Sequence, residues 1–100
     1  MSKHFNELTP AEAERLAMLS EECGEVIQII GKILRHGYES RHPNGGPTNR
    51  VMLTREMTDI FAVAREMLTC GDVASDPADC ELDAAWQKKL RYAHHQDEVF

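Results

Sequence analysis

Apolar residues recur every three or four positions over two long stretches of the chain, which is the spacing of a helix with one buried face. The first stretch begins after Thr9 and stops at Gly37, and the second begins near Asn49 and stops at Gly71. A shorter and weaker pattern of the same kind follows towards the C-terminus. Three helices are therefore predicted, over about residues 10–36, 49–70 and 76–94.

The limits of the first helix are marked by local chemistry. Thr9 can cap the first turn, Pro10 suits the first helical position, and Glu12 completes a capping box. Gly37 follows the last periodic residue and is a typical helix stop. The next stretch, 38–48, holds two prolines and a Gly-Gly pair, so it is predicted to be a loop. Loops of this length are often functional.

The overall prediction is an all-α fold, an antiparallel bundle of about three main helices formed as one domain by residues 1–100. A chain of 100 residues buries only a thin core, so we expect oligomerisation to complete the bundle. The formal net charge of −6 argues against a nucleic-acid-binding protein, which needs a basic surface to replace the counterions of the phosphates.

Several features favour a cytoplasmic location. No apolar run reaches membrane-spanning length, and the first six residues hold no apolar segment of a signal peptide. The three cysteines are scattered and form no zinc-binding pattern, which is typical of reduced thiols. Cys23 and Cys70 have apolar neighbours, so they are predicted to be small core residues. No membrane partner is expected.

Acidic residues stand close to the apolar stripes of both long helices. Glu22 and Glu25 form an ExxE pair, and Glu56 and Asp59 form an ExxD pair. On a stripe centred near Ile30, Glu22 lies about 80° and Glu25 about 140° from the centre. On the second helix Glu56 lies only about 40° from Ile60, within the stripe. A carboxylate facing a core is costly unless a partner neutralises it.

A divalent cation is the economical partner for carboxylates that face one another across two helices. Mg²⁺ prefers oxygen ligands and commonly links a few carboxylates to substrate phosphates, and Mn²⁺ is an alternative ion for such a set. The competing interpretation is that these acids simply pair with lysines and arginines nearby. A di-iron site is disfavoured, because it requires Glu-x-x-His motifs that neither helix contains.

The segment Glu21-Glu22-Cys23-Gly24-Glu25, followed by Glu56-Met57-Thr58-Asp59, resembles the EExxE…ExxD signature of the MazG-like all-α nucleoside triphosphate pyrophosphohydrolases. The likeness covers about residues 10–70 and is closest to small phage and bacterial members. It implies a homodimer or homotetramer that hydrolyses nucleoside triphosphates to monophosphate and pyrophosphate with Mg²⁺. Thirty residues separate Glu25 from Glu56, slightly more than is usual, and the loop accounts for the excess.

The resemblance assigns roles to particular residues. Its metal ligands are Glu22, Glu25, Glu56 and Asp59. Glu21 is an additional acid, and either Glu21 or Glu22 is expected to take a proton from the attacking water.

Residues near the loop are predicted to bind the substrate. Lys32 lies about two turns beyond Glu25 on nearly the same face, within reach of a phosphate, although a solvated ion pair would explain it equally well. Asn49 and Arg50 begin the second helix, where the N-terminus favours anions, although helix capping alone would explain Asn49. His36 is interpreted as a helix-end residue rather than a ligand.

Three alternatives stay open. The main one is a non-catalytic helical module that dimerises through its apolar stripes, with its acids in solvent. A nucleic-acid-binding helical domain is disfavoured by the charge. Within the enzyme class, a phosphoribosyl-ATP pyrophosphohydrolase uses related acidic helices. The burial of Glu56 separates the first alternative from the enzyme, because a solvated module has no reason to place a carboxylate on its core stripe.

Overall fold

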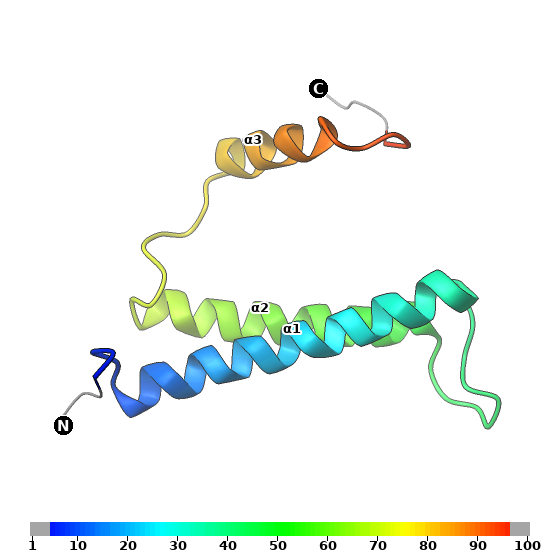
Figure 1. Ribbon diagram of the computed structural model, residues 1–100, viewed down its shortest axis with the longest axis horizontal. Coiled ribbons are helices and arrows are strands. Elements are labelled where there is room, and N and C mark those ends of the chain that lie inside the picture. Colours follow the sequence, from blue (N-terminus) through cyan, green and yellow to red (C-terminus); the bar gives the residue numbers. More distant parts are fainter. Residues whose placement is uncertain (1–4, 97–100) are drawn as a thin grey trace.

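The computed structural model describes residues 5–96 and shows an all-α fold, as predicted. Helix α1 runs over Pro10–His36, α2 over Asn49–Thr69 and α3 over Asp79–Leu90, and the described part of the chain contains no strand. Helices α1 and α2 lie side by side in antiparallel directions, joined by the 37–48 loop at one end (Figure 1). The two long helices therefore form a hairpin.

The ends of α1 follow the predicted chemistry. The Thr9 hydroxyl accepts a hydrogen bond from the Glu12 backbone N–H at 3.1 Å, and the Glu12 carboxylate accepts one from the Thr9 N–H at 2.7 Å. At the other end Gly37 has φ +90°, and its N–H donates to the Ile33 carbonyl at 2.7 Å. A side chain at position 37 would be strained in that conformation, so glycine ends the helix there.

Helices α1 and α2 meet along a seam in which shielded residues recur at alternating spacings of three and four, the pattern of a two-stranded coiled coil. We call this contact the α1/α2 seam. On α1 its members are Glu12, Arg15, Leu19, Glu22, Val26, Ile29 and Ile33. On α2 they are Asn49, Leu53, Glu56, Ile60, Val63 and Met67. In the middle of the seam, Glu22 and Glu56 therefore occupy positions that a coiled coil normally gives to apolar residues.

An ion pair fixes the end of the hairpin opposite the loop. The Arg15 guanidinium donates two hydrogen bonds to the Asp72 carboxylate, at 2.5 and 3.0 Å. Arg15 is on α1 and Asp72 follows the C-terminal end of α2, so the pair joins segments 57 residues apart. Because the guanidinium donates two hydrogen bonds, it fixes the relative orientation of the two side chains as well as the distance between them.

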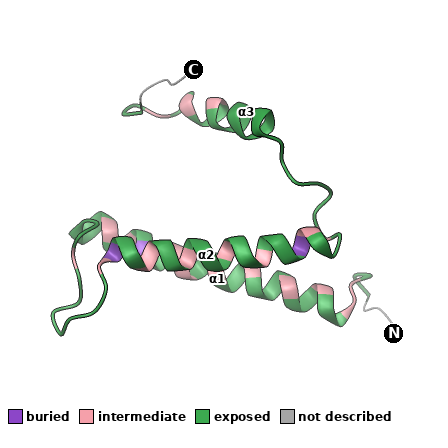
Figure 2. Ribbon diagram, turned by 180° about the vertical axis from the view of Figure 1, so that it is seen from behind, coloured by how far each residue is buried: buried purple, intermediate pink, exposed green. Residues whose placement is uncertain are grey.

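Very little of the chain is buried. Among the described residues, only Ile29, Met67 and Asn49 are buried, and all three belong to the α1/α2 seam (Figure 2). The radius of gyration is 17.4 Å, whereas a compact domain of 100 residues has about 13 Å. A single chain thus has a seam but no enclosed core.

Helix α3 packs against neither α1 nor α2 (Figure 1). It begins at Asp79 and ends at Leu90, so the predicted range 76–94 was too long at both ends. The backbone before it is still extended at Ala78, whose N–H donates to the Glu81 carboxylate at 3.0 Å. A helix that packs against no other helix has little to extend it beyond its local capping signals.

A second set of apolar side chains faces solvent on the hairpin. Leu34 is 82% exposed, Ile27 69% and Phe61 62%. The prediction that Cys23 and Cys70 belong to a core is wrong, because both thiols are exposed.

The described helices include none with the length and apolar character needed to cross a lipid bilayer. The expectation that no signal peptide is present rests largely on residues 1–4, which lie outside the described residues.

Candidate metal centre

The acids of α1 face α2 more directly than the sequence indicated. The most buried residue of α1 is Ile29, whereas Ile30, on which the predicted stripe was centred, is 43% exposed. Measured from Ile29, Glu22 lies only about 20° and Glu25 about 40° away. The predicted angles were therefore too large, because exposed apolar residues of α1 shifted the apparent centre of the stripe.

Carboxylates from the two helices converge in the middle of the α1/α2 seam. Oxygens of Glu22, Glu56 and Asp59 lie within 4.8 Å of one another, and so do oxygens of Glu21, Glu22 and Glu25. Glu22 belongs to both groups, so it joins the ExxE pair of α1 to the ExxD pair of α2. The structure brings together all five acids that the sequence analysis selected, and we call them the acid cluster.

The cluster holds two carboxylate oxygens that water does not reach. Oε2 of Glu22 and Oε2 of Glu56 are both shielded from solvent and have no hydrogen-bond donor. Buried carboxylate oxygens normally accept hydrogen bonds, and leaving them without donors is costly. These two atoms therefore need either a proton or a cation.

The electrostatic environment shows the same shortage of positive charge. The pKa of Glu56 is raised to about 7, first because its protonated carboxyl can share a proton with Glu25, then by burial, and then by the same kind of sharing with Glu22. Burial raises the pKa of Glu22, and the charge of Glu25 raises it further. Near neutral pH the chain alone thus favours a shared proton over a full set of carboxylates.

The donor set suits a hard divalent cation. It offers only carboxylate oxygens, and Glu22 can serve two neighbouring positions because it belongs to both groups. Glu21 and Asp59 are exposed, so one side of the cluster is open to solvent. An ion held there would keep water or substrate oxygens among its ligands, as Mg²⁺ usually does.

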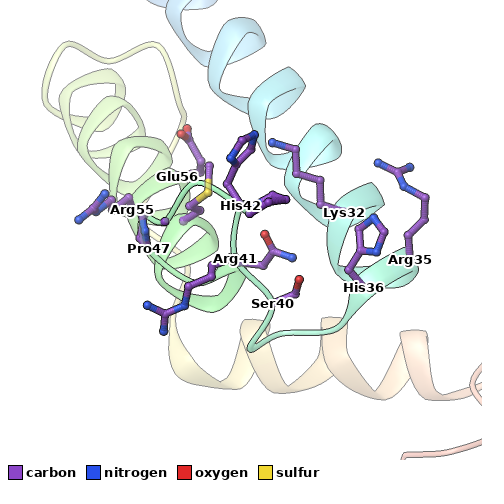
Figure 3. Close-up of a pocket in the computed structure, with 13 residues that line it drawn as sticks. Lys32, Arg35, His36, Ser40, Arg41, His42, Pro47, Arg55 and Glu56 are labelled. Atoms are coloured by element: carbon purple, nitrogen blue, oxygen red, sulfur yellow. The ribbon is translucent and has the colours of Figure 1, made fainter.

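A cavity of about 680 Å³ adjoins the cluster at Glu56. It lies between the C-terminal half of α1, the 37–48 loop and the start of α2 (Figure 3). Two of the predicted substrate-binding residues, Lys32 and Asn49, line it. Asn49 is buried, and its side-chain amide donates to the Gly37 carbonyl at 3.1 Å.

Arg50, the third predicted substrate-binding residue, is engaged elsewhere. Its guanidinium donates to Glu39 at 2.7 Å and lies 4.3 Å from the centre of the Tyr38 ring. It does not line the cavity. In this structure Arg50 holds the beginning of the loop against the start of α2.

Several polar residues that line the cavity were not predicted from the sequence as site residues: His36, Ser40, Arg41, His42 and Arg55. His36 was interpreted only as a helix-end residue. The available signal was the placement of a long loop with cationic side chains between the two acidic motifs. That pattern locates a functional loop, but it does not say which side chains turn inward.

Comparisons with models of protein families, with curated proteins and with solved structures each gave no match to this chain.

Proposed function

We propose that this protein is a Mg²⁺-dependent nucleoside triphosphate pyrophosphohydrolase of the MazG-like type. It would convert a nucleoside or deoxynucleoside triphosphate and water to the monophosphate and pyrophosphate. The observation that carries the proposal is the pair of shielded, donor-free carboxylate oxygens of Glu22 and Glu56 in the α1/α2 seam. A seam built only to hold two helices together is more stable with apolar residues at those positions.

The residues of the acid cluster divide into two roles. Glu22, Glu25, Glu56 and Asp59 would hold Mg²⁺, with Mn²⁺ as an alternative. The ion supplies positive charge to the phosphate oxygens and makes water more acidic. Glu21 is an exposed acid that lies with the ExxE pair, and Glu21 or Glu22 would accept the proton of the attacking water.

The bond changes in the proposed reaction are simple. The water oxygen forms a bond to the α-phosphorus while the bond from that phosphorus to the oxygen bridging to the β-phosphorus breaks. Pyrophosphate leaves with the electron pair, and the carboxylate of Glu21 or Glu22 holds the proton lost by water. Cationic side chains lining the adjoining cavity would offset the charge of the leaving group.

The enzyme is further proposed to act as a homodimer or homotetramer in the cytoplasm. The exposed residues Ile27, Leu34 and Phe61 leave an apolar face on the hairpin, and Trp86 on the detached α3 is 46% exposed. A Cβ added at Gly24 would meet no atom within 4 Å, so packing within one chain does not require glycine in the middle of α1. A second copy covering this face would supply the core that one chain lacks.

A non-catalytic dimerisation module is supported by the same exposed apolar face. It does not account for the acid cluster, because a module that uses its outer face to dimerise gains nothing from carboxylates in its inner seam. The shielded oxygens of Glu22 and Glu56 therefore favour the enzyme.

The experiment that tests the proposal measures pyrophosphate release from a panel of nucleoside and deoxynucleoside triphosphates, with phosphoribosyl-ATP included. Each reaction is run with Mg²⁺ and with EDTA. Wild type is compared with Glu56→Gln and with Glu66→Gln, which removes an exposed carboxylate from the same helix outside the cluster. We expect release with Mg²⁺ in wild type and Glu66→Gln, and a loss of about a hundredfold or more in Glu56→Gln.

Several results would contradict the proposal. Release that continues in EDTA, or that Glu56→Gln leaves unchanged, contradicts the metal cradle. If folded wild type leaves every nucleotide intact, the dimerisation module becomes the better account.

A further inference from the structure

The cavity beside Glu56 is strongly cationic. Lys32, Arg35, Arg41 and Arg55 contribute to its lining, and Glu56 is the one acidic side chain among the lining residues. The chain as a whole is acidic, with a net charge of −6, so this concentration of positive charge is local. A cavity of this size and charge suits an anionic ligand or the anionic part of a larger one.

Three of the lining side chains extend toward the same space. Figure 3 shows Lys32 reaching from α1, His42 reaching from the loop and Glu56 reaching from α2. Arg41 and Arg55 project outward in the same view. Lys32 and His42 are therefore the donors best placed to meet a ligand that also reaches the acid cluster.

A hydrogen bond within the loop determines which ring nitrogen of His42 carries the proton. Nδ1 of His42 accepts a hydrogen bond from the Asn44 backbone N–H at 3.1 Å. In the neutral imidazole the proton therefore belongs on Nε2. The ring thus offers a hydrogen-bond donor on the side away from Asn44.

The loop that carries His42 is tied to the start of α2. The N–H groups of Asn49 and Arg50 donate to the carbonyls of Ser40 at 2.8 Å and Tyr38 at 2.9 Å. Within the loop, the Gly45 N–H donates to the His42 carbonyl at 2.8 Å. The position of His42 is set before any ligand arrives, which lowers the ordering cost of binding.

We propose that His42 and Lys32 form a diphosphate subsite, in which His42 Nε2–H and the Lys32 ammonium bind the β- and γ-phosphates of the substrate. This assignment rests on the proposed function. The reaction requires the α-phosphate at the acid cluster, and the rest of the triphosphate carries most of the charge. That part extends into the cationic cavity, and the pyrophosphate leaves from there.

The test is titration calorimetry of inorganic pyrophosphate into the full chain, in Mg²⁺ and in EDTA. His42→Asn keeps an acceptor for the Asn44 N–H but loses the Nε2 donor, whereas His42→Gln places an amide N–H near the position of Nε2. Lys32→Met removes the ammonium, and Arg65→Met removes an exposed cation of α2 that does not line the cavity.

We expect pyrophosphate to bind about tenfold more weakly to His42→Asn and to Lys32→Met in both buffers. His42→Gln is expected to recover part of the loss, and Arg65→Met to bind like wild type. Such recovery distinguishes a donor to the ligand from a residue that only shapes the loop. Circular dichroism of each variant checks that the helices are retained.

Two results would overturn the subsite: no binding of pyrophosphate to wild type, or equal binding by wild type, His42→Asn and Lys32→Met. A dependence of nucleoside monophosphate binding on His42, with pyrophosphate binding unaffected, would also overturn it and place the nucleoside in the cavity. Because binding is measured without turnover, the outcome is separate from that of the proposed reaction. If nucleotides are hydrolysed but pyrophosphate binding does not depend on His42, the subsite alone is rejected. If pyrophosphate binding depends on His42 but no nucleotide is hydrolysed, the reaction alone is rejected.

Discussion

Glu22 on α1 and Glu56 on α2 approach each other across the α1/α2 seam, and each keeps one carboxylate oxygen shielded from solvent without a donor. Like charges in that arrangement destabilise the hairpin unless something positive joins them. A cation held by this pair would therefore stabilise the hairpin, and several consequences of the proposal can be measured.

Removing one charge from the pair should have opposite effects on stability and on activity. Glu56→Gln keeps the shape of the side chain and removes a carboxylate that the metal-free chain has to accommodate. In EDTA we expect a higher melting temperature than for wild type, by a few degrees. In Mg²⁺ we expect wild type to gain stability and the variant to gain little, because the ion stabilises the folded chain only if it binds.

Scanning fluorimetry of wild type, Glu56→Gln and Glu66→Gln, with EDTA and with increasing Mg²⁺, measures both effects. Glu66→Gln should respond to Mg²⁺ as wild type does. Equal Mg²⁺ responses in all three proteins would contradict the link between this pair and the ion.

The stability of the metal-free chain should fall as pH rises through about 7. The pKa of Glu56 is raised to about 7 in the folded chain, above that of an ordinary glutamate, so the folded state holds a proton that the unfolded state has released. The stabilising effect of that proton is complete at acidic pH and is lost as Glu56 ionises. Denaturant titrations in EDTA between pH 5.5 and 8.5, roughly centred on that pKa, should show the decline, and Glu56→Gln should flatten it.

Arg15 and Asp72 should show the opposite dependence on pH. The hydrogen bond from Arg15 holds the pKa of Asp72 below its usual value, so the folded chain keeps this carboxylate ionised at a pH where the unfolded chain protonates it. The contribution is present above the ordinary pKa of aspartate and is lost as pH falls through the lowered one. Asp72→Asn should lower the melting temperature at pH 7, and the difference from wild type should shrink in acid.

A neighbouring exposed acid provides the control for this pair. Asp76 follows α2 in the same connecting segment, and Asp76→Asn should leave the melting temperature near that of wild type. If Asp72→Asn and Asp76→Asn behave alike, the ion pair does not stabilise the end of the hairpin.

A charge on the outer apolar face should break the proposed oligomer. Leu34 is 82% exposed in one chain, and each such side chain covered by a partner contributes about 2 kcal/mol. Leu34→Glu should therefore shift the molar mass toward the 11.3 kDa of one chain, whereas Ser75→Glu, which adds the same charge at an exposed position after α2, should not. Light scattering after size-exclusion chromatography measures the mass, and a wild type that is already monomeric would refute the oligomer.

The ends of α1 could be read from the sequence because local groups determine them. Thr9 and Glu12 bond to each other's backbone, and Gly37 takes up a positive φ, without help from distant residues. The five acids could also be selected, because their spacing repeats on two helices. The face of α1 that packs against α2 was harder to predict, because two apolar stripes overlap on that helix. Only the packing shows that Ile29 is buried and Ile30 is exposed.

The extent of α3 and the residues of the cavity could not be predicted. Helix α3 makes no contact with α1 or α2, so its limits depend on weak local signals around Ala78. His42 lies in a loop whose path depends on backbone hydrogen bonds, including those from Asn49 to Ser40 and from Asn44 to His42. No periodic pattern encodes the direction of such a side chain.

The most direct test of the central claim is phosphorus-31 NMR of a nucleoside triphosphate incubated with the protein and Mg²⁺. The account predicts that monophosphate and pyrophosphate appear together at equal rates, with no diphosphate, and that EDTA stops both. Formation of nucleoside diphosphate and inorganic phosphate, or signals unchanged across the whole nucleotide panel, would contradict the assignment of the acid cluster to pyrophosphohydrolysis.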